Sequence, residues 1–195
     1  MKELFFTFIL KFDVFTKEEI QAIVANTKIE SFKKETVILT EGEVCTKCYF
    51  ILSGFVRQYQ FVDGVKKTTA FFLEEEAAVF YKSYLNKLPS LYYLSRVEDS
   101  ILITGTREDE EKLHLLYPTL THMVPTLMQQ DYLKIEERIF VFSNHTPEER
   151  YLILMQTQPE LMKRVPFHQL ARYIGITPES FSRIRKIIFQ NDKSA

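Results

Sequence analysis

The chain has 195 residues, of which 46% are hydrophobic and 26% charged, and its formal net charge at pH 7 is −1. This composition is typical of a globular protein with one or two apolar cores and excludes a disordered chain. The longest apolar stretch near the start, residues 4–10, is far shorter than the roughly 20 residues that a membrane span needs. No cleavage site follows it, and two cysteines, Cys45 and Cys48, cannot staple a chain of this length. We therefore expect a cytoplasmic protein that is not bound to a membrane.

Charge is distributed unevenly along the chain. Residues 1–143 carry 17 Lys and Arg against 21 Asp and Glu, whereas residues 144–195 carry 8 against 5. Residues 161–191 contain six basic side chains and a single acidic one, Glu179. A polyanionic partner for this C-terminal segment fits the asymmetry, and so does an ordinary basic surface.

The pattern in the first half of the chain predicts short helices followed by an antiparallel β-structure. Residues 1–26 are helical in pattern, with a capping box from Thr16 to Glu19. Strand-like runs separated by turn signals then occupy residues 29–104. The clearest is a hairpin in which residues 55–62 and 65–72 flank an Asp-Gly turn. Such closely spaced strands indicate a sandwich, barrel or roll.

A helical pattern begins again at Thr106, which is a second predicted cap, and Pro118 marks the break between this helix and the next. Beyond it, apolar side chains recur at intervals of four and three along one predicted helix: Val124, Met128, Tyr132, Ile135, Ile139 and Phe142. This stripe fits packing on the helix's own domain, and it also fits a dimer seam between two subunits. A third cap, Thr146, with Pro147 and Glu149 behind it, starts a new helix and marks a domain boundary.

Residues 167–187 have the spacing of a helix-turn-helix. Ala171 falls where two crossed helices approach closely, and Gly175 supplies the turn. Thr177 caps the second helix and Pro178 occupies its first turn. We expect Leu170, Ile174, Ile176, Phe181 and Ile184 to form the core between the two helices.

The second helix leaves a polar face for a DNA major groove. The candidate DNA-binding residues are Thr177, Pro178, Glu179, Ser180, Ser182, Arg183, Arg185, Lys186 and His168. Arg183 is suited to pair with guanine, while Arg185 and Lys186 are suited to phosphates. The alternative is a helical hairpin with no role in DNA binding.

The sequence resembles the Crp/Fnr superfamily of bacterial regulators, especially its short members from Bacteroidetes. The resemblance covers nearly the whole chain and is most specific at residues 147–151, 164–166 and 174–185, with weaker matches at 41–43 and 49–56. It implies an α+β fold: an N-terminal antiparallel β-roll (a double-stranded β-helix like that of cyclic-nucleotide-binding domains), a long dimerisation helix and a C-terminal helix-turn-helix. The corresponding domains are 1–116 (sensor), 117–143 (dimerisation helix) and 144–195 (DNA binding).

Departures from the family pattern bear on the effector. Cyclic-nucleotide binders of the family hold the ribose with a Gly-Glu pair and the phosphate with an arginine, and residues 74–90 contain three carboxylates but neither glycine nor arginine. We therefore expect no cofactor and an effector other than cyclic AMP, with Lys82, Lys87 and Ser90 as the candidate anion contacts. Two cysteines are too few for the family's four-thiolate iron-sulfur cluster, and no metal is expected. We expect the β-hairpin wing to be absent or truncated.

Two other classes of function are possible for a chain with a β-roll. A cupin-like metalloenzyme needs clustered histidines, but all four (His114, His122, His145 and His168) lie outside the predicted roll, and no catalytic motif occurs. An enzyme is therefore not expected. A ligand-binding or protein-interaction module that has lost DNA binding remains the alternative to a homodimeric transcription regulator. The regulator's expected partners are double-stranded DNA, a second copy of the chain, RNA polymerase and an unidentified small-molecule effector.

Overall fold

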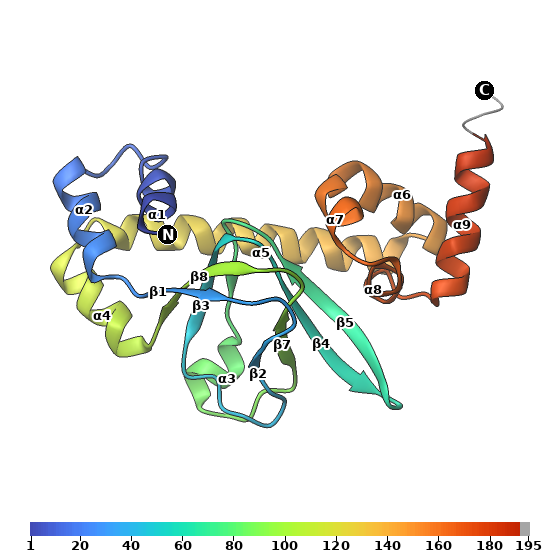
Figure 1. Ribbon diagram of the computed structural model, residues 1–195, viewed down its shortest axis with the longest axis horizontal. Coiled ribbons are helices and arrows are strands. Elements are labelled where there is room, and N and C mark those ends of the chain that lie inside the picture. The colour runs from blue at the N-terminus through green and yellow to red at the C-terminus, as the bar shows by residue number, and fades with distance from the viewer. Residues whose placement is uncertain (192–195) are drawn as a thin grey trace. The chain divides into compact units, whose positions relative to one another are not determined.

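The computed structural model describes residues 1–191, without the side chains of residues 122, 189 and 191 (Figure 1). The helices are α1 (Lys2–Ile9), α2 (Lys17–Asn26), α3 (Tyr81–Asn86), α4 (Arg107–Leu116), α5 (Leu120–Asn144), α6 (Pro147–Thr157), α7 (Pro159–Arg164), α8 (Phe167–Tyr173) and α9 (Pro178–Asn191). The strands are β1 (Ile29–Phe32), β2 (Val37–Leu39), β3 (Cys48–Ser53), β4 (Val56–Val62), β5 (Val65–Phe72), β6 (Ala77–Ala78), β7 (Tyr93–Arg96) and β8 (Ser100–Gly105).

The chain divides into two compact units. The first contains residues 1–60 and 71–132, and the second contains residues 61–70 together with the chain from Leu133 onward. The division therefore falls within α5 and assigns the tip of one hairpin to the C-terminal unit.

The first unit is built on a roll of two four-stranded antiparallel sheets, ordered β1-β8-β3-β6 and β2-β7-β4-β5. Alternate residues of the strands face the interior, because successive side chains of a strand point to opposite faces. Tyr49 and Ile51 of β3 pack there with Val56 and Leu94 of the other sheet. This arrangement confirms the predicted antiparallel roll.

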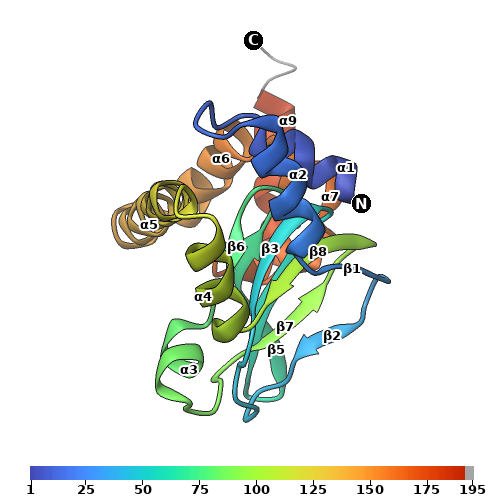
Figure 2. The ribbon, with the colours of Figure 1, turned by 90° about the vertical axis from the view of Figure 1, so that its left-hand side faces the viewer.

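The outer face of the first sheet is covered by helices (Figure 2). Phe5, Phe8 and Ile9 of α1 join Ile20 and Ile23 of α2 in a second apolar cluster. Phe50 and Leu52, which alternate with the interior residues of β3, pack against this cluster. The Thr16 capping box that begins α2 is present as predicted. The N-terminal helices thus bury the sheet face that the roll leaves uncovered.

The predicted hairpin is confirmed, with β4 and β5 running side by side to its turn (Figure 1). Asp63 and Gly64 both have positive φ, 50° and 75°. Two consecutive residues of this kind form the turn whose twist matches that of the flanking strands. The Asp-Gly pair by itself therefore determines where the chain reverses direction.

The predicted helix starts of the C-terminal half are also confirmed. Thr106 and Thr146 each accept a hydrogen bond in a full capping box, with Asp109 and Glu149 as the third-position partners. Between these two caps α5 runs for 25 residues with Pro125 inside it.

Membrane-spanning helices and the predicted wing are the two remaining points about the fold. No helix within residues 1–191 is both long and apolar enough to cross a membrane. The expectation about the wing extends to residues 192–195, which lie outside the described part of the chain, and it stays a prediction.

Candidate nucleic-acid interface

The two helices of residues 167–191 are joined by a tight glycine turn. Gly175 has a φ of +79°, and its N–H donates to the carbonyl of Arg172 at 3.3 Å. The N–H of Ile176 donates to the carbonyl of Ala171 at 2.9 Å. These two bonds form a Schellman motif, which ends a helix by satisfying its last carbonyls. The chain can then leave α8 at once and begin α9 at Pro178.

One face of α9 is buried against α6 and α8. Phe181 and Ile184 are nearly inaccessible, and Phe181 meets Tyr151 of α6 edge-on at a ring-centroid distance of 5.1 Å. From α8 the core receives Leu170 and Ala171, both fully buried. The small side chain at position 171 thus lies in the core, as predicted. Of the expected core residues only Ile176 is half-buried.

The start of α9 is held by the predicted cap. The Thr177 hydroxyl accepts from the N–H of Ser180 at 3.2 Å. Hydrogen bonds from its own backbone N–H and from the Thr177 hydroxyl lower the pKa of the exposed Glu179 carboxyl. The Glu179 carboxylate is therefore engaged at the helix start, where an acidic group also favours the helix dipole.

The opposite face of α9 is exposed to solvent. It carries Ser182, Arg183 and Lys186 beside Glu179. Arg183 and Lys186 form no hydrogen bond or ion pair within the described residues. Their charged groups are thus available to an external partner. Ile187, one turn beyond Arg183, is 50% exposed and extends this face. Its exposure could not be predicted from the sequence, because an apolar side chain is expected to be buried.

Four of the predicted contact residues are either half-buried on α9 or belong to α8. The guanidinium of Arg185 stacks 4.2 Å from the ring centre of Phe167, and the side chain is half-buried. His168 is exposed in the first turn of α8. Pro178 and Ser180 are half-buried at the start of α9.

The apolar stripe of α5 is largely uncovered. Met128, Tyr132, Ile135 and Ile139 are 46%, 63%, 57% and 62% exposed. Val124 and Phe142, at its two ends, are half-buried. Four large apolar side chains on one helix thus remain in contact with solvent in the single chain.

The candidate effector contacts do not form a cluster of available groups. Lys82 and Lys87 are exposed on and just after α3. Ser90 is buried, and its hydroxyl donates to the carbonyl of Tyr92 and accepts from the N–H of the same residue. In the preceding segment the carboxylate of Glu74 accepts from the N–H of Gly54 at 2.9 Å.

Sequence reasoning did not single out Arg138 and Arg150, which stack on aromatic rings of the C-terminal unit. Arg138 lies over Tyr173, 35 positions away in the chain. No local pattern in the sequence marks a pair so far apart, and only the packed structure brings the two side chains together.

Comparison with known proteins finds a matching domain family and similar solved structures. Residues 29–114 match the family model of the cyclic nucleotide-binding domain. None of the curated proteins matches the sequence significantly.

Several solved structures share the fold. The c-di-GMP responsive global regulator CLP of Xanthomonas campestris has a TM-score of 0.71 at 16% identity, over 91% of this chain and 93% of its own. FixK2 of Bradyrhizobium japonicum has a TM-score of 0.65 at 18% identity, over 85% and 86%. The catabolite activator protein of Thermus thermophilus has a TM-score of 0.53 at 20% identity, over 93% and 87%. Residues 29–114 therefore match the cyclic nucleotide-binding domain, and the structural neighbours of the chain include transcription regulators of the Crp/Fnr family.

Proposed function

We propose that the chain is a sequence-specific, DNA-binding transcription regulator that acts as a homodimer and is not an enzyme. In this proposal residues 1–116 form the sensor, residues 117–143 the dimerisation helix and residues 144–195 the DNA-binding domain, with α8 and α9 as its helix-turn-helix.

One observation carries the proposal. α9 buries Phe181 and Ile184 in its own unit, and it turns Arg183 and Lys186 outward with no partner in the described chain. A recognition helix needs this division, because its buried face fixes its orientation while its exposed face enters the major groove. Arg183 would pair with guanine, and Lys186 would contact phosphate.

Dimerisation would bring two such helices to one operator. The exposed side chains of Met128, Tyr132, Ile135 and Ile139 supply an apolar stripe that a second copy of α5 would cover. A two-fold dimer reads half-sites about one helical turn apart, so its operator should be palindromic. RNA polymerase would then be a further partner at the promoter.

The effector is proposed to be different from cyclic AMP. Residues 74–90 contain no arginine to pair with a cyclic phosphate, and the Ser90 hydroxyl is engaged with Tyr92. Glu74 and Glu76 accept backbone hydrogen bonds, from Gly54 and Leu73, and they belong to the segment that holds the ribose and the phosphate in cyclic-nucleotide binders of the family. Carboxylates so placed disfavour an anionic ligand. Among the structural neighbours, CLP is c-di-GMP responsive, so a protein of this fold can respond to a nucleotide other than cyclic AMP.

The test is selection of bound sequences from a random duplex library, repeated at low and at high salt. We expect a palindromic motif whose enrichment weakens steeply as salt rises, because phosphate contacts release counterions. Failure to enrich any sequence at low salt would overturn the proposal. It would favour the alternative, a module that has kept its roll and lost DNA binding.

A further inference from the structure

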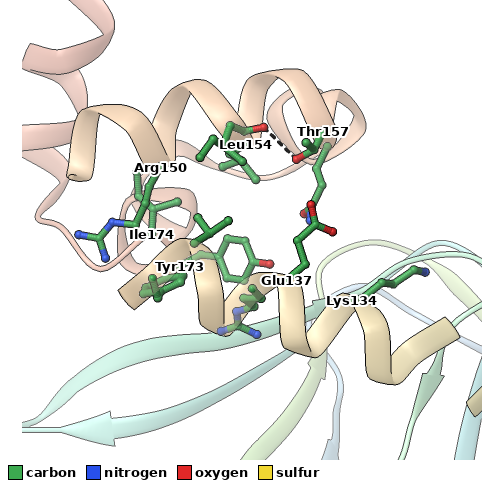
Figure 3. A pocket seen from close by; sticks show the side chains of 12 residues that line it. Lys134, Glu137, Arg150, Leu154, Thr157, Tyr173 and Ile174 are labelled. Atoms are coloured by element: carbon green, nitrogen blue, oxygen red, sulfur yellow. Dashed lines mark hydrogen bonds between the residues drawn. The ribbon is translucent and has the colours of Figure 1, made fainter. Parts of the chain in front are cut away.

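A pocket within the C-terminal unit is lined by the second half of α5, by α6 and by the end of α8 (Figure 3). It contains about 510 Å³ of empty space, including the solvent at its mouth. Leu154 and Ile174 give it apolar walls, and the ring of Tyr173 lies between the two facing helices (Figure 3). A concave site with apolar walls and a few polar groups is the usual form of a small-molecule site.

Two arginines that line this pocket have their guanidinium groups over aromatic rings. The guanidinium carbon of Arg138 is 4.8 Å from the ring centre of Tyr173 and 5.7 Å from that of Phe142. The guanidinium carbon of Arg150 is 4.9 Å from the same Phe142 ring. Stacking of this kind holds the face of a guanidinium and leaves the N–H groups at its edge for an acceptor.

No acceptor for these N–H groups occurs in the described chain. Neither the Arg138 nor the Arg150 side chain forms a hydrogen bond or an ion pair within residues 1–191. The Nε of Arg150 is buried without any partner. Glu137 also lines the pocket, yet its carboxylate pairs with neither arginine. A buried donor without an acceptor is unfavourable, so an acceptor from outside the chain would be stabilising.

We propose that this pocket binds a small organic dicarboxylic acid. Each guanidinium would hold one carboxylate, because its planar fork matches the two oxygens of a carboxylate. The body of the acid would pack against Leu154 and Ile174, which favours an apolar or aromatic skeleton. The pocket lies outside the matched cyclic nucleotide-binding domain, which covers residues 29–114. The site is thus distinct from any effector site in the roll.

The test follows the side-chain Nε–Hε signals of arginine by NMR in the full chain, titrated with isophthalate to millimolar concentration. Benzoate, with one carboxylate, and benzamide, its uncharged counterpart, serve as comparison probes. We expect isophthalate to shift the signals of Arg138 and Arg150 and to bind more tightly than benzoate, with no binding of benzamide. Unchanged signals, or equal binding of all three compounds, would overturn the proposal.

Variants tie the binding to the pocket. Arg138→Gln and Arg150→Gln should each weaken isophthalate binding by roughly tenfold or more, because each removes one charge-assisted pair. Arg172→Gln is the matched control, since Arg172 donates to the carbonyl of Lys66 and does not line the pocket. If Arg150→Gln is destabilised, Arg138→Gln alone decides. Equal affinity of Arg138→Gln and the unmodified chain contradicts the proposal. No DNA is present in these titrations, so their outcome is separate from that of the duplex selection.

Discussion

The N–H of Ile176 donates to the carbonyl of Ala171 at 2.9 Å, and this bond closes the turn that follows the end of α8 at Tyr173. The bond requires the left-handed backbone that Gly175 adopts at φ +79°. Gly175→Ala should therefore lower the free energy of unfolding by about 1 to 2 kcal/mol, because a Cβ disfavours that conformation. Urea unfolding measures the change.

Gly105→Ala is the matched control for this substitution. Gly105 is not among the positive-φ glycines, and a Cβ there would meet its nearest neighbours only at 3.9 and 4.0 Å. An equal loss of stability at positions 105 and 175 would show that backbone conformation is not the cause.

On α9, Arg183 and Lys186 should affect DNA binding in different ways. Arg183→Ala should cost about 1 to 3 kcal/mol and relax preference at one base pair. Lys186→Ala should weaken binding to all duplexes alike and reduce the salt slope by about 1. Fluorescence anisotropy against the selected operator, over a series of salt concentrations, measures both effects. Lys163→Ala is the control, because Lys163 of α7 forms an ion pair with Glu160. An unchanged base preference in Arg183→Ala would rule out its recognition role.

On α5, Ile139→Asp should convert the dimer to a monomer. Ile139 is 62% exposed in the single chain, so a charge there disturbs an interface more than a fold. Sedimentation at micromolar concentration gives the mass of the species, and circular dichroism verifies the fold. Leu91→Asp is the control at a similarly exposed apolar position outside α5. A dimer that persists in Ile139→Asp would place the subunit contact elsewhere.

The capping box of α6 should make the free energy of unfolding depend on pH in the acidic range. The Glu149 carboxylate accepts from the N–H and the hydroxyl of Thr146 at 2.7 and 2.9 Å, and the N–H bond, followed by the hydroxyl bond, lowers the pKa of Glu149 below its usual 4.5. A carboxyl with a lowered pKa in the folded state stabilises the fold above its unfolded pKa and loses that effect as pH falls. Glu149→Gln should therefore be less stable than the unmodified chain at neutral pH, and the difference should shrink below about pH 4.5.

Urea unfolding at several pH values measures this difference. Glu148→Gln is the control, since the neighbouring Glu148 forms no hydrogen bond within the described residues. A constant difference between pH 7 and pH 3 would contradict the assignment.

Inside the roll, Arg96 is 2% exposed, and its Nη1 and Nη2 have no partner within the described residues. Burial lowers the pKa of Arg96, although Asp99 opposes the shift. The Nε of Arg96 donates to the carbonyl of Thr36 at 3.4 Å. Because a buried charge with two unsatisfied nitrogens is costly, Arg96→Met should leave the unfolding free energy unchanged or raise it. Arg96→Ala should be less stable than Arg96→Met by about 2 kcal/mol, since it leaves a cavity over Phe32. A large loss of stability in Arg96→Met would show that the guanidinium stabilises the fold.

Features that depend on a few neighbouring residues could be predicted from the sequence. The caps at Thr16, Thr106 and Thr146 each join residues three positions apart, and the Asp63-Gly64 turn needs only two residues of positive φ. The helix-turn spacing around Gly175 is local in the same sense. These patterns therefore predicted the roll, the long helix and the helix pair formed by α8 and α9.

Features that depend on residues far apart in the chain were decided by tertiary packing. Arg185, which is predicted to contact phosphate, lies over the ring of Phe167, and Arg172 donates to the carbonyl of Lys66 in a distant hairpin. The pocket arginines, Arg138 and Arg150, likewise meet their ring partners only when α5, α6 and α8 come together. Periodicity tells which face of a helix is apolar, but it does not tell which side chain from another element will lie against that face. That choice depends on the shape and charge of the assembled helices, and only the folded chain contains this information.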